Sequence, residues 1–520
     1  MGIVPNPNGP WVEAKGSLQL PKICTVNYGG FATYCTEKYF ERSGIFMEEV
    51  TESAVLQLIR DATLAPEEYH IRVDSGIRIT AATEKGVIWA LTSLFLETQN
   101  GVHKQGELKD KPRYSFRGFH FDCARHFFSV ETVERILDVA GLSKLNHMHW
   151  HLTNDQGWRI ESTRYPLLTS TGSYYTQTDI RRIVSYARKC GIEIIPEINV
   201  PGHTSAILAA YPQFGCFEKT VPLRASGGIY PVILCGGKEE TLTFIKNILT
   251  ETSELFPCEF FHVGGDEAPK TEWEKCPHCK TRMEENNITE IEELQGWLLS
   301  QVSAHLASLG KRTICWNDGF LESNFSDNVI VQYWTKNVKT NHAATYWKQG
   351  GNVIFSDALH CYFDYPIAMT NLKRVYSYVP KLDKTNCSDA KNTLGIECCL
   401  WTEGIETPEQ IGQRLFPRLF AIAEIGWSKQ RNYANFEQNL AVMLHYLDKQ
   451  GLSHMPLSES NLKGKARREQ VAQYFMAVSE HLGTSEGSVA LDRKFLLKTM
   501  FKIFGLSAIP LFMILLKGQK

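Results

Sequence analysis

Two adjacent carboxylates, Asp266 and Glu267, close the run His262-Val-Gly-Gly-Asp-Glu and are well suited to acid–base chemistry. When like charges are held close together, the pKa of one carboxyl group rises, so one group can stay protonated while the other is ionised. A proton donor beside an anion suits cleavage of a glycosidic bond. The two preceding glycines allow the backbone to pack closely against neighbours or a ligand. Taken alone, the same pair could be a solvated acidic turn or the start of a helix.

Three tryptophans and one arginine could bind a sugar beside these carboxylates. Trp316, Trp334 and Trp401 each fall at the end of an apolar run, and three converging indoles could wall a pocket for one pyranose ring. A single tryptophan there would more commonly be core packing. Arg117 with Glu403 could form a charge-assisted pair for sugar hydroxyls. The alternative for Arg117 is a buried structural ion pair.

From Tyr114 onward, short apolar runs alternate with helical patterns, which predicts βα units around a parallel sheet. We predict strands at Ser115–Cys123, Met148–Thr153, Ile192–Val200, Phe260–Val263, Thr313–Trp316, Val329–Trp334, Val353–Phe355 and Gly395–Leu400. We predict helices at Val130–Leu145, Asp179–Cys190, Glu239–Leu255, Ile291–Leu306, Asn341–Trp347 and Gln410–Ile425. Eight strands at this spacing are typical of a (β/α)₈ TIM barrel, an α/β fold whose chemistry lies at the C-terminal strand ends.

The predicted strand ends are rich in polar and aromatic residues. They are Asp122, Arg125 and His126; Asn154, Asp155 and Gln156; Glu197, Asn199 and His203; Asp266 and Glu267; Trp316, Asn317 and Asp318; Trp334; Tyr362 and Asp364; and Trp401 and Glu403. A core-only interpretation predicts apolar residues or turn formers at these places. We therefore interpret this edge of the barrel as the functional one.

Composition and pattern divide the chain into three parts. We expect residues 1–112 to form a small α+β domain and a linker, 113–450 the catalytic barrel, and 451–520 a helical extension with an apolar tail. Hydrophobic residues make up 43% of the 520, so the chain can bury a large core without disulfides. The net charge of −2 gives no sign of a nucleic-acid partner or an anionic membrane.

The fourteen cysteines are too few over this length for a disulfide scaffold. Cys216 and Cys235 flank a loop-like stretch and could pair, and Cys276 and Cys279 form a Cys-Pro-His-Cys tetrapeptide. A zinc site would require a second pair of ligands at a similar spacing, and none stands out. We favour a local disulfide or free thiols, and we expect no metal or organic cofactor.

The termini leave the compartment open. No apolar leader is visible at the N-terminus, whereas Asn287, Asn324 and Asn386 begin glycosylation sequons. We expect a secretory-pathway protein, lysosome-like, secreted or at the cell surface. Ile503–Leu516 is too short to span a bilayer and contains Pro510, so it is either a weakly membrane-associated tail or a buried or frayed terminus. A homodimer is left open.

Six runs together resemble glycoside hydrolase family 20, the β-N-acetylhexosaminidases. They are RGFHFDCARHFFSVETV, HMHWHLTNDQGWRIES, PEINVPGHTSA, HVGGDE, VQYW and LWTEG. The resemblance extends from about residue 60 to about residue 430, and the preceding α+β unit is also expected for that family. It implies a retaining exo-glycosidase that removes terminal β-linked N-acetylglucosamine or N-acetylgalactosamine from oligosaccharides, glycoproteins or glycolipids.

The resemblance also implies substrate-assisted catalysis, in which the sugar's own acetamido oxygen is the nucleophile and an oxazolinium forms. Glu267 matches the general acid and base, Asp266 the carboxylate that binds the acetamido N–H, and Tyr362 the donor to the acetamido oxygen. His203 matches a histidine that contacts the acid. The residues that match substrate-binding positions are Arg117, Asp122, His262, Trp316, Trp334, Asp364, Trp401 and Glu403.

Two positions depart from the family pattern. Asn199 stands where an aspartate usually supports the histidine that matches His203, and Asn154 also stands where an aspartate is common. An amide cannot stabilise an imidazolium as a carboxylate does. We expect the two changes to shift the pH profile or lower the rate without abolishing the mechanism.

Two other functions fit parts of the pattern. The first is a catalytically weak sugar-binding protein on the same fold, which the presence of both Asp266 and Glu267 disfavours. The second is a zinc hydrolase using His147, His149, His151 and His203, because strand alternation places the first three on one face.

Overall fold

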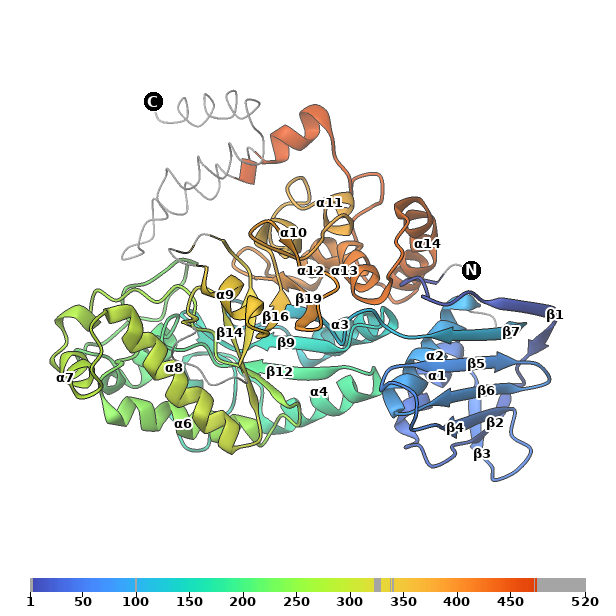
Figure 1. Ribbon diagram of the computed structural model, residues 1–520, viewed down its shortest axis with the longest axis horizontal. Helices are drawn as coiled ribbons and strands as arrows, with labels where there is room; N and C mark the ends of the chain where they lie inside the picture. The colour runs from blue at the N-terminus through green and yellow to red at the C-terminus, as the bar shows by residue number, and fades with distance from the viewer. Residues whose placement is uncertain are drawn as a thin grey trace.

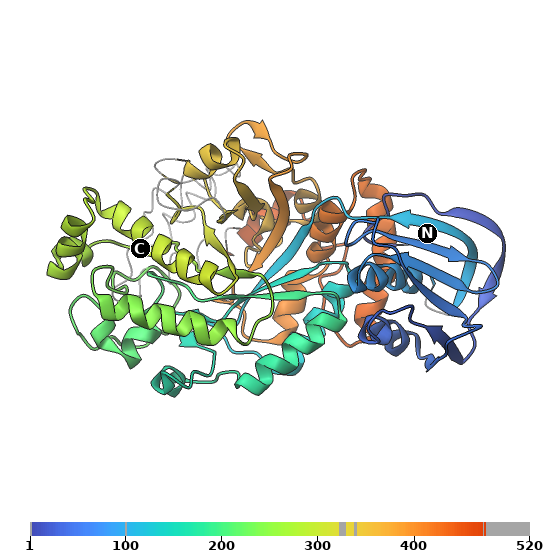
Figure 2. The ribbon, with the colours of Figure 1, turned by 60° about the horizontal axis from the view of Figure 1, so that its bottom comes forward.

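The computed structural model describes residues 3–98, 101–321, 329–336, 338, 341–471 and 473–474. An N-terminal sheet lies at one end of an elongated molecule and a closed barrel fills the rest (Figures 1 and 2). The helix α7 (Pro277–Glu285) lies at the end opposite the N-terminal sheet in both views.

The N-terminal unit is a seven-stranded mixed sheet of order β1-β7-β5-β6-β4-β2-β3. Its strands are β1 (Val12–Gln19), β2 (Ile23–Asn27), β3 (Phe46–Glu49), β4 (Leu56–Arg60), β5 (Tyr69–Val73), β6 (Ile77–Ala81) and β7 (Val102–Asp110). Its helices are α1 (Tyr34–Ser43) and α2 (Glu84–Glu97). Thr83 caps α2 by accepting a hydrogen bond from the Gly86 N–H. The prediction of a small α+β unit before the barrel is confirmed.

Eight parallel strands close the barrel in the order β12-β13-β14-β15-β16-β19-β8-β9. They are β8 (Phe116–Asp122), β9 (His147–His151), β12 (Glu193–Glu197), β13 (Phe260–His262), β14 (Arg312–Trp316), β15 (Ile330–Tyr333), β16 (Asn352–Phe355) and β19 (Thr393–Leu400). Every predicted barrel strand is therefore confirmed. The ends differ from the predicted ones by up to three residues, in both directions, because an apolar run does not mark where strand hydrogen bonding begins and ends.

Helices surround the barrel, together with shorter elements in the loops. The helices are α3 (Val130–Leu142), α4 (Gln177–Lys189), α5 (Ser205–Ala210), α6 (Glu239–Ser253), α8 (Ile291–Ser308), α9 (His342–Lys348), α10 (Ala358–Cys361), α11 (Leu372–Tyr376), α12 (Pro408–Leu415), α13 (Arg418–Trp427) and α14 (Tyr433–Lys449). Short 3₁₀ turns are η1 (Pro166–Thr171), η2 (Pro212–Phe214) and η3 (Trp273–Lys275). Two small hairpins pair β10 (Thr153–Asn154) with β11 (Gly157–Trp158), and β17 (Lys381–Leu382) with β18 (Thr385–Asn386).

The single helix predicted over Gln410–Ile425 is wrong, because the segment forms two helices, α12 and α13. Pro417 lies at the break and has no N–H with which to continue the first helix. Thr407 begins α12 with a capping box that also uses Gln410.

The barrel interior changes from apolar to polar along its axis. At the N-terminal end, Phe116, Ile195, Ile314, Ile330 and Ile354 pack together in one buried cluster. A layer of buried histidines and carboxylates lies above it, and an aromatic cluster closes the C-terminal end. The N-terminal half of the barrel thus supplies packing, and the C-terminal half carries the groups with chemistry.

Arg117 belongs to the apolar end of the barrel, so the prediction that it pairs with Glu403 is wrong. Its guanidinium is fully buried, forms an ion pair with Glu67 of the N-terminal unit, and donates to the backbone oxygens of Lys144 (2.9 Å) and Tyr114 (2.7 Å). It also lies 5.0 Å from the ring centroid of Trp427. Arg117 therefore forms a buried structural ion pair with Glu67, which is the alternative that the sequence left open.

Two of the sequence features named above lie outside the described residues. They are Ile503–Leu516 and Asn324, whereas Asn287 and Asn386 are described and exposed. Among the described helices, none combines the length and the apolar character needed to cross a bilayer.

Arg117→Met should destabilise the fold without weakening ligand binding at the opposite end of the barrel. The substitution removes the cation that pairs with the part-buried Glu67, and breaking a buried ion pair typically costs about 3–5 kcal/mol. The matched control is Arg72→Met, since Arg72 pairs with Asp74 on the surface (3.2 Å) and should cost below about 1 kcal/mol. Urea unfolding followed by tryptophan fluorescence measures both. An unchanged unfolding midpoint for Arg117→Met would contradict the structural role.

Candidate active site

A left-handed turn after β13 carries the paired carboxylates. Gly264 and Gly265 have φ of 69° and 93°, and Glu267 has φ of 46°, which is uncommon for a residue with a side chain. A Cβ on Gly264 would lie 2.0 Å from Oδ1 of Asn199, so only glycine fits there. The turn points the adjacent carboxyl groups of Asp266 and Glu267 into different surroundings.

Asp266 is buried and held by Asn199, whose Nδ2 donates to Asp266 Oδ1 at 2.7 Å. The Asn199 Oδ1 accepts from the Gly265 N–H (3.2 Å), so one amide fixes both the carboxyl group and the turn. Burial raises the pKa of Asp266 to about 6, and the charges of Glu197 and Glu267 act in the same direction. Asp266 therefore gains its negative charge only as the pH rises through about 6.

His203 links Glu267 to a second carboxylate, Asp155. The His203 Nδ1 lies 3.0 Å from Asp155 Oδ2, and its Nε2 lies 3.4 Å from Glu267 Oε2 and 3.7 Å from Asp266 Oδ2. Burial alone would lower the pKa of His203. The hydrogen bonds with Asp155 and Glu267 outweigh burial and, with the charge of Asp266, raise this pKa well above its usual value.

The expected link between Asn199 and His203 is therefore wrong. Asp155 supports the imidazole, and it is fixed by the Ser205 N–H (2.9 Å) and hydroxyl (2.6 Å). Asn199 contacts Asp266 instead. Asn154 lies further away, with its Nδ2 2.9 Å from His151 Nε2. The imidazolium thus keeps a carboxylate partner.

Asp318, which follows β14, connects the carboxylate turn to the aromatic residues. Its Oδ2 accepts from the Glu267 N–H (3.0 Å) and its Oδ1 accepts from Trp334 Nε1 (2.8 Å). Burial and the charge of Asp266 raise the pKa of Asp318 to about 7. Asp318 was named at a strand end but not as a site residue, because its sequence context does not reveal which backbone it faces.

The three tryptophans converge with Tyr362 at the C-terminal mouth of the barrel, as predicted. Trp334 and Tyr362 stack with ring centroids 6.0 Å apart, and Tyr362 lies 6.2 Å from Trp401. Trp316 and Trp401 are 5.9 Å apart. The four rings form an aromatic box with the carboxylate turn beside it. A flat amide or an apolar sugar face fits such walls.

A buried hydrogen-bond network holds the floor of the aromatic box. Glu197 accepts from Trp316 Nε1 (3.1 Å) and pairs with His149 (3.0 Å) and His151, and its Oε1 lies 3.3 Å from His262 Nδ1. Burial would lower the pKa of His149, but Glu397 and Glu197 raise it to about 9. His149 is therefore a cation that neutralises the buried carboxylates near neutral pH.

His262 and Asp122 were predicted to bind substrate, but both side chains are fully buried beneath the pocket. His262 lies 4.9 Å from the Trp316 ring centroid and accepts from the Gly264 N–H (3.0 Å). Asp122 accepts from the N–H groups of Arg125 (3.1 Å) and Thr402 (3.1 Å). Both residues accept hydrogen bonds from backbone N–H groups of the site.

Arg125 takes the place that the sequence analysis assigned to Arg117. Its Nη2 lies 3.3 Å from Glu403 Oε1, its Nη1 lies 3.2 Å from Asp122 Oδ2, and its guanidinium lies over the Trp401 ring (4.9 Å). Burial and the charge of Glu403 raise the pKa of Asp364 to about 8. The Asp364 Oδ1 is buried and has no hydrogen-bond partner among the described residues, so it can accept a hydrogen bond from a ligand hydroxyl.

The histidines of the zinc-hydrolase alternative do not gather at one place. Among the described residues, His203 groups with Asp266 and Glu267, and His149 groups with His120 and Glu197. His147 stacks on Phe116 at the opposite end of the barrel, with ring centroids 4.5 Å apart. The structure therefore gives this alternative no support.

Comparisons with known proteins agree with this geometry. Residues 114–430 match the family model "Glycosyl hydrolase family 20, catalytic domain". A β-hexosaminidase of Porphyromonas gingivalis is 34% identical over 432 residues, which cover 76% of this chain and 56% of that protein. The chain thus spans little more than half the length of that relative.

Two solved structures extend the likeness to the whole described fold. A β-N-acetylhexosaminidase from Bacteroides fragilis is 30% identical with a TM-score of 0.79, covering 87% of this chain and 97% of that one. An exo-β-N-acetylglucosaminidase from Vibrio harveyi, solved in complex with N-acetylglucosamine, is 28% identical with a TM-score of 0.77, covering 88% and 78%.

Proposed function

Because this chain belongs to glycosyl hydrolase family 20, we propose that it is a retaining exo-β-N-acetylhexosaminidase that acts by substrate assistance. The observation that carries the proposal is the aromatic box of Trp316, Trp334, Tyr362 and Trp401 beside the Asp266–Glu267 turn. The box offers walls for an acetamido group, and the turn offers a proton donor and an anion. The relatives' printed names support the same substrate class.

The first step of the proposed reaction breaks the glycosidic bond. The acetamido oxygen attacks the anomeric carbon, the bond to the leaving oxygen breaks, and Glu267 gives its proton to that oxygen. Asp266 accepts a hydrogen bond from the acetamido N–H and opposes the positive charge of the oxazolinium, and the Tyr362 hydroxyl donates to the acetamido oxygen. A nucleophile that is part of the substrate loses no further translational or rotational entropy when it reacts, so effective molarities can reach about 10⁵ M or more.

The second step restores the enzyme and the sugar. Water attacks the anomeric carbon, Glu267 takes its proton, and the acetamido group re-forms as the ring of the oxazolinium opens. Two inversions at one carbon give net retention. His203, held by Asp155, keeps Glu267 in place through both proton transfers.

The clamp of Arg125, Glu403 and Asp364 supports exo action. Arg125 and Glu403 offer a charge-assisted pair to sugar hydroxyls, and Asp364 offers an oxygen to which no described residue donates. These groups bind the hydroxyls of the terminal ring on the side away from the scissile bond. The substrates are then terminal β-N-acetylglucosamine or β-N-acetylgalactosamine on oligosaccharides, glycoproteins or glycolipids.

Glu267→Gln should lower kcat/KM by roughly 10²–10⁴-fold for a substrate with a poor leaving group, since the proton donor is lost. The loss should be much smaller for a dinitrophenyl β-N-acetylglucosaminide, whose leaving group needs little protonation. The control is Glu406→Gln, an exposed carboxyl in the loop after β19, which should leave both values unchanged. Equal losses on both substrates would contradict the acid role. Full activity of Glu267→Gln would overturn the proposed function.

Asn199→Asp should move the acidic limb of the kcat/KM profile to higher pH. The change replaces the donor on Asp266 by a second carboxyl group, so the pKa of Asp266 rises from about 6 and its ionised form appears later as the pH increases. Because the reaction needs ionised Asp266, activity at mildly acidic pH falls. Asn154→Asp, which faces His151, serves as the control. An acidic limb that stays in place or moves to lower pH would contradict the role of Asn199.

A further inference from the structure

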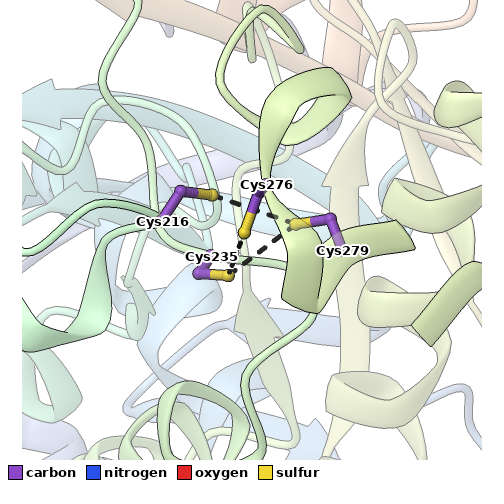
Figure 3. Close-up of side chains that lie close together, drawn as sticks. All are labelled: Cys216, Cys235, Cys276 and Cys279. Carbon is purple, nitrogen blue, oxygen red and sulfur yellow. Dashed lines mark hydrogen bonds between the residues drawn. The ribbon is translucent and has the colours of Figure 1, made fainter. Parts of the chain in front are cut away.

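Four cysteines from two active-site loops gather in one buried cluster (Figure 3). Cys216 and Cys235 lie in the loop between β12 and α6, and Cys276 and Cys279 lie at the start of α7, in the loop between β13 and α8. The Cys216–Cys279, Cys235–Cys276 and Cys235–Cys279 Sγ atoms are 3.9, 3.8 and 3.7 Å apart. All four side chains are buried, with at most 6% of any residue exposed.

These distances fit a metal better than disulfides. A disulfide needs two sulfurs about 2.05 Å apart, and all four cysteines are free thiols. Four thiolates around a tetrahedral zinc at about 2.3 Å lie about 3.8 Å from one another, which is the spacing seen here. Each Sγ lies within 4.8 Å of the other three, so the four can share one ion.

The backbone is shaped to bring the two cysteine pairs together. A Cβ on Gly237 would lie 2.2 Å from the carbonyl of His278 and 2.3 Å from the N of Cys279, so glycine is required for the loops to approach. Cys276 is the N-cap of α7 and Cys279 lies in its first turn.

We propose that Cys216, Cys235, Cys276 and Cys279 bind a structural Zn²⁺ ion. The site is closed, because four protein ligands complete the tetrahedron and burial leaves no room for a reacting water. The sequence shows no second ligand pair at a zinc-like spacing for Cys276 and Cys279. The second pair is Cys216 and Cys235, whose wide separation along the chain gives no zinc-like spacing.

The ion joins the two loops that carry the candidate acid–base groups. One loop carries His203, and its Leu234, next to Cys235, donates from its N–H to the oxygen of Pro201 (3.1 Å). The other loop carries Asp266 and Glu267, and its Trp273 donates from Nε1 to the Leu234 oxygen (2.9 Å). Zinc therefore holds in register the segments between which the His203–Glu267 contact forms.

The first test is the metal content of the full chain, expressed with zinc in the medium and purified without chelator. Mass spectrometry should find about one equivalent of zinc per chain. Replacing zinc with Co²⁺ should give the strong visible absorption of tetrahedral cobalt together with thiolate-to-metal charge transfer. Neither readout depends on catalytic activity, so a failure of the zinc proposal can be distinguished from a failure of the proposed function.

The second test removes two ligands by the double change Cys276→Ser and Cys279→Ser. Zinc content should fall by at least about tenfold, the cobalt spectrum should disappear, and the unfolding temperature should drop. Cys35→Ser changes a buried cysteine of the N-terminal unit and should keep the zinc. Wild-type protein with zinc below a tenth of an equivalent, disulfide-linked peptides from the four cysteines, iron in place of zinc, or full zinc content in the double variant would each overturn the proposal.

Discussion

The hydrogen bond from Asn199 to Asp266 is the interaction on which the site depends. Asp266 and Glu267 are neighbours in sequence, and without a fixed turn their carboxyl groups would share one environment. The Asn199 amide fixes Asp266 through one end and the Gly265 N–H through the other, while His203 approaches Glu267 from the next loop. The positive φ of Glu267 is a strained conformation that these contacts maintain. The Asp266 carboxyl group is thereby buried at the box, whereas 32% of the Glu267 side chain stays exposed.

The polar middle of the barrel makes this arrangement tolerable inside a folded protein. A buried carboxylate such as Glu197 would be costly alone, but four side chains contact it and His149 supplies a positive charge. Removing any one member would leave a buried group unpaired, so the network specifies one arrangement of the floor. The hydrogen bond to Glu197 fixes the Trp316 ring, and Trp316 in turn fixes one wall of the aromatic box. The apolar layer below and Arg117 at the base stabilise the barrel without taking part in the site.

Strand positions and most of the site could be predicted from sequence, because a parallel barrel brings every C-terminal strand end to one edge. The sequence alone could not show which of Arg117 and Arg125 contacts Glu403. Arg117 lies at the start of β8 and Arg125 follows its end, so the five steps of strand from Arg117 to Asp122 separate the two ends by about 17 Å along the strand. The sequence did not identify Asp155 as the partner of His203, because the two residues lie in different loops, 48 positions apart along the chain. The cysteine cluster was missed because only the packing of two long loops brings its halves together.

If the substrate supplies its own nucleophile, the 2-acetamido group is required for the reaction. Matched aryl β-glycosides that differ only at carbon two test this requirement directly. We expect the N-acetylglucosaminide to have a kcat/KM at least about a thousandfold above that of the glucoside, because a 2-hydroxyl cannot replace the intramolecular amide as nucleophile. Comparable kcat/KM values for the two substrates would contradict substrate assistance, since the reaction would then proceed without the acetamido nucleophile.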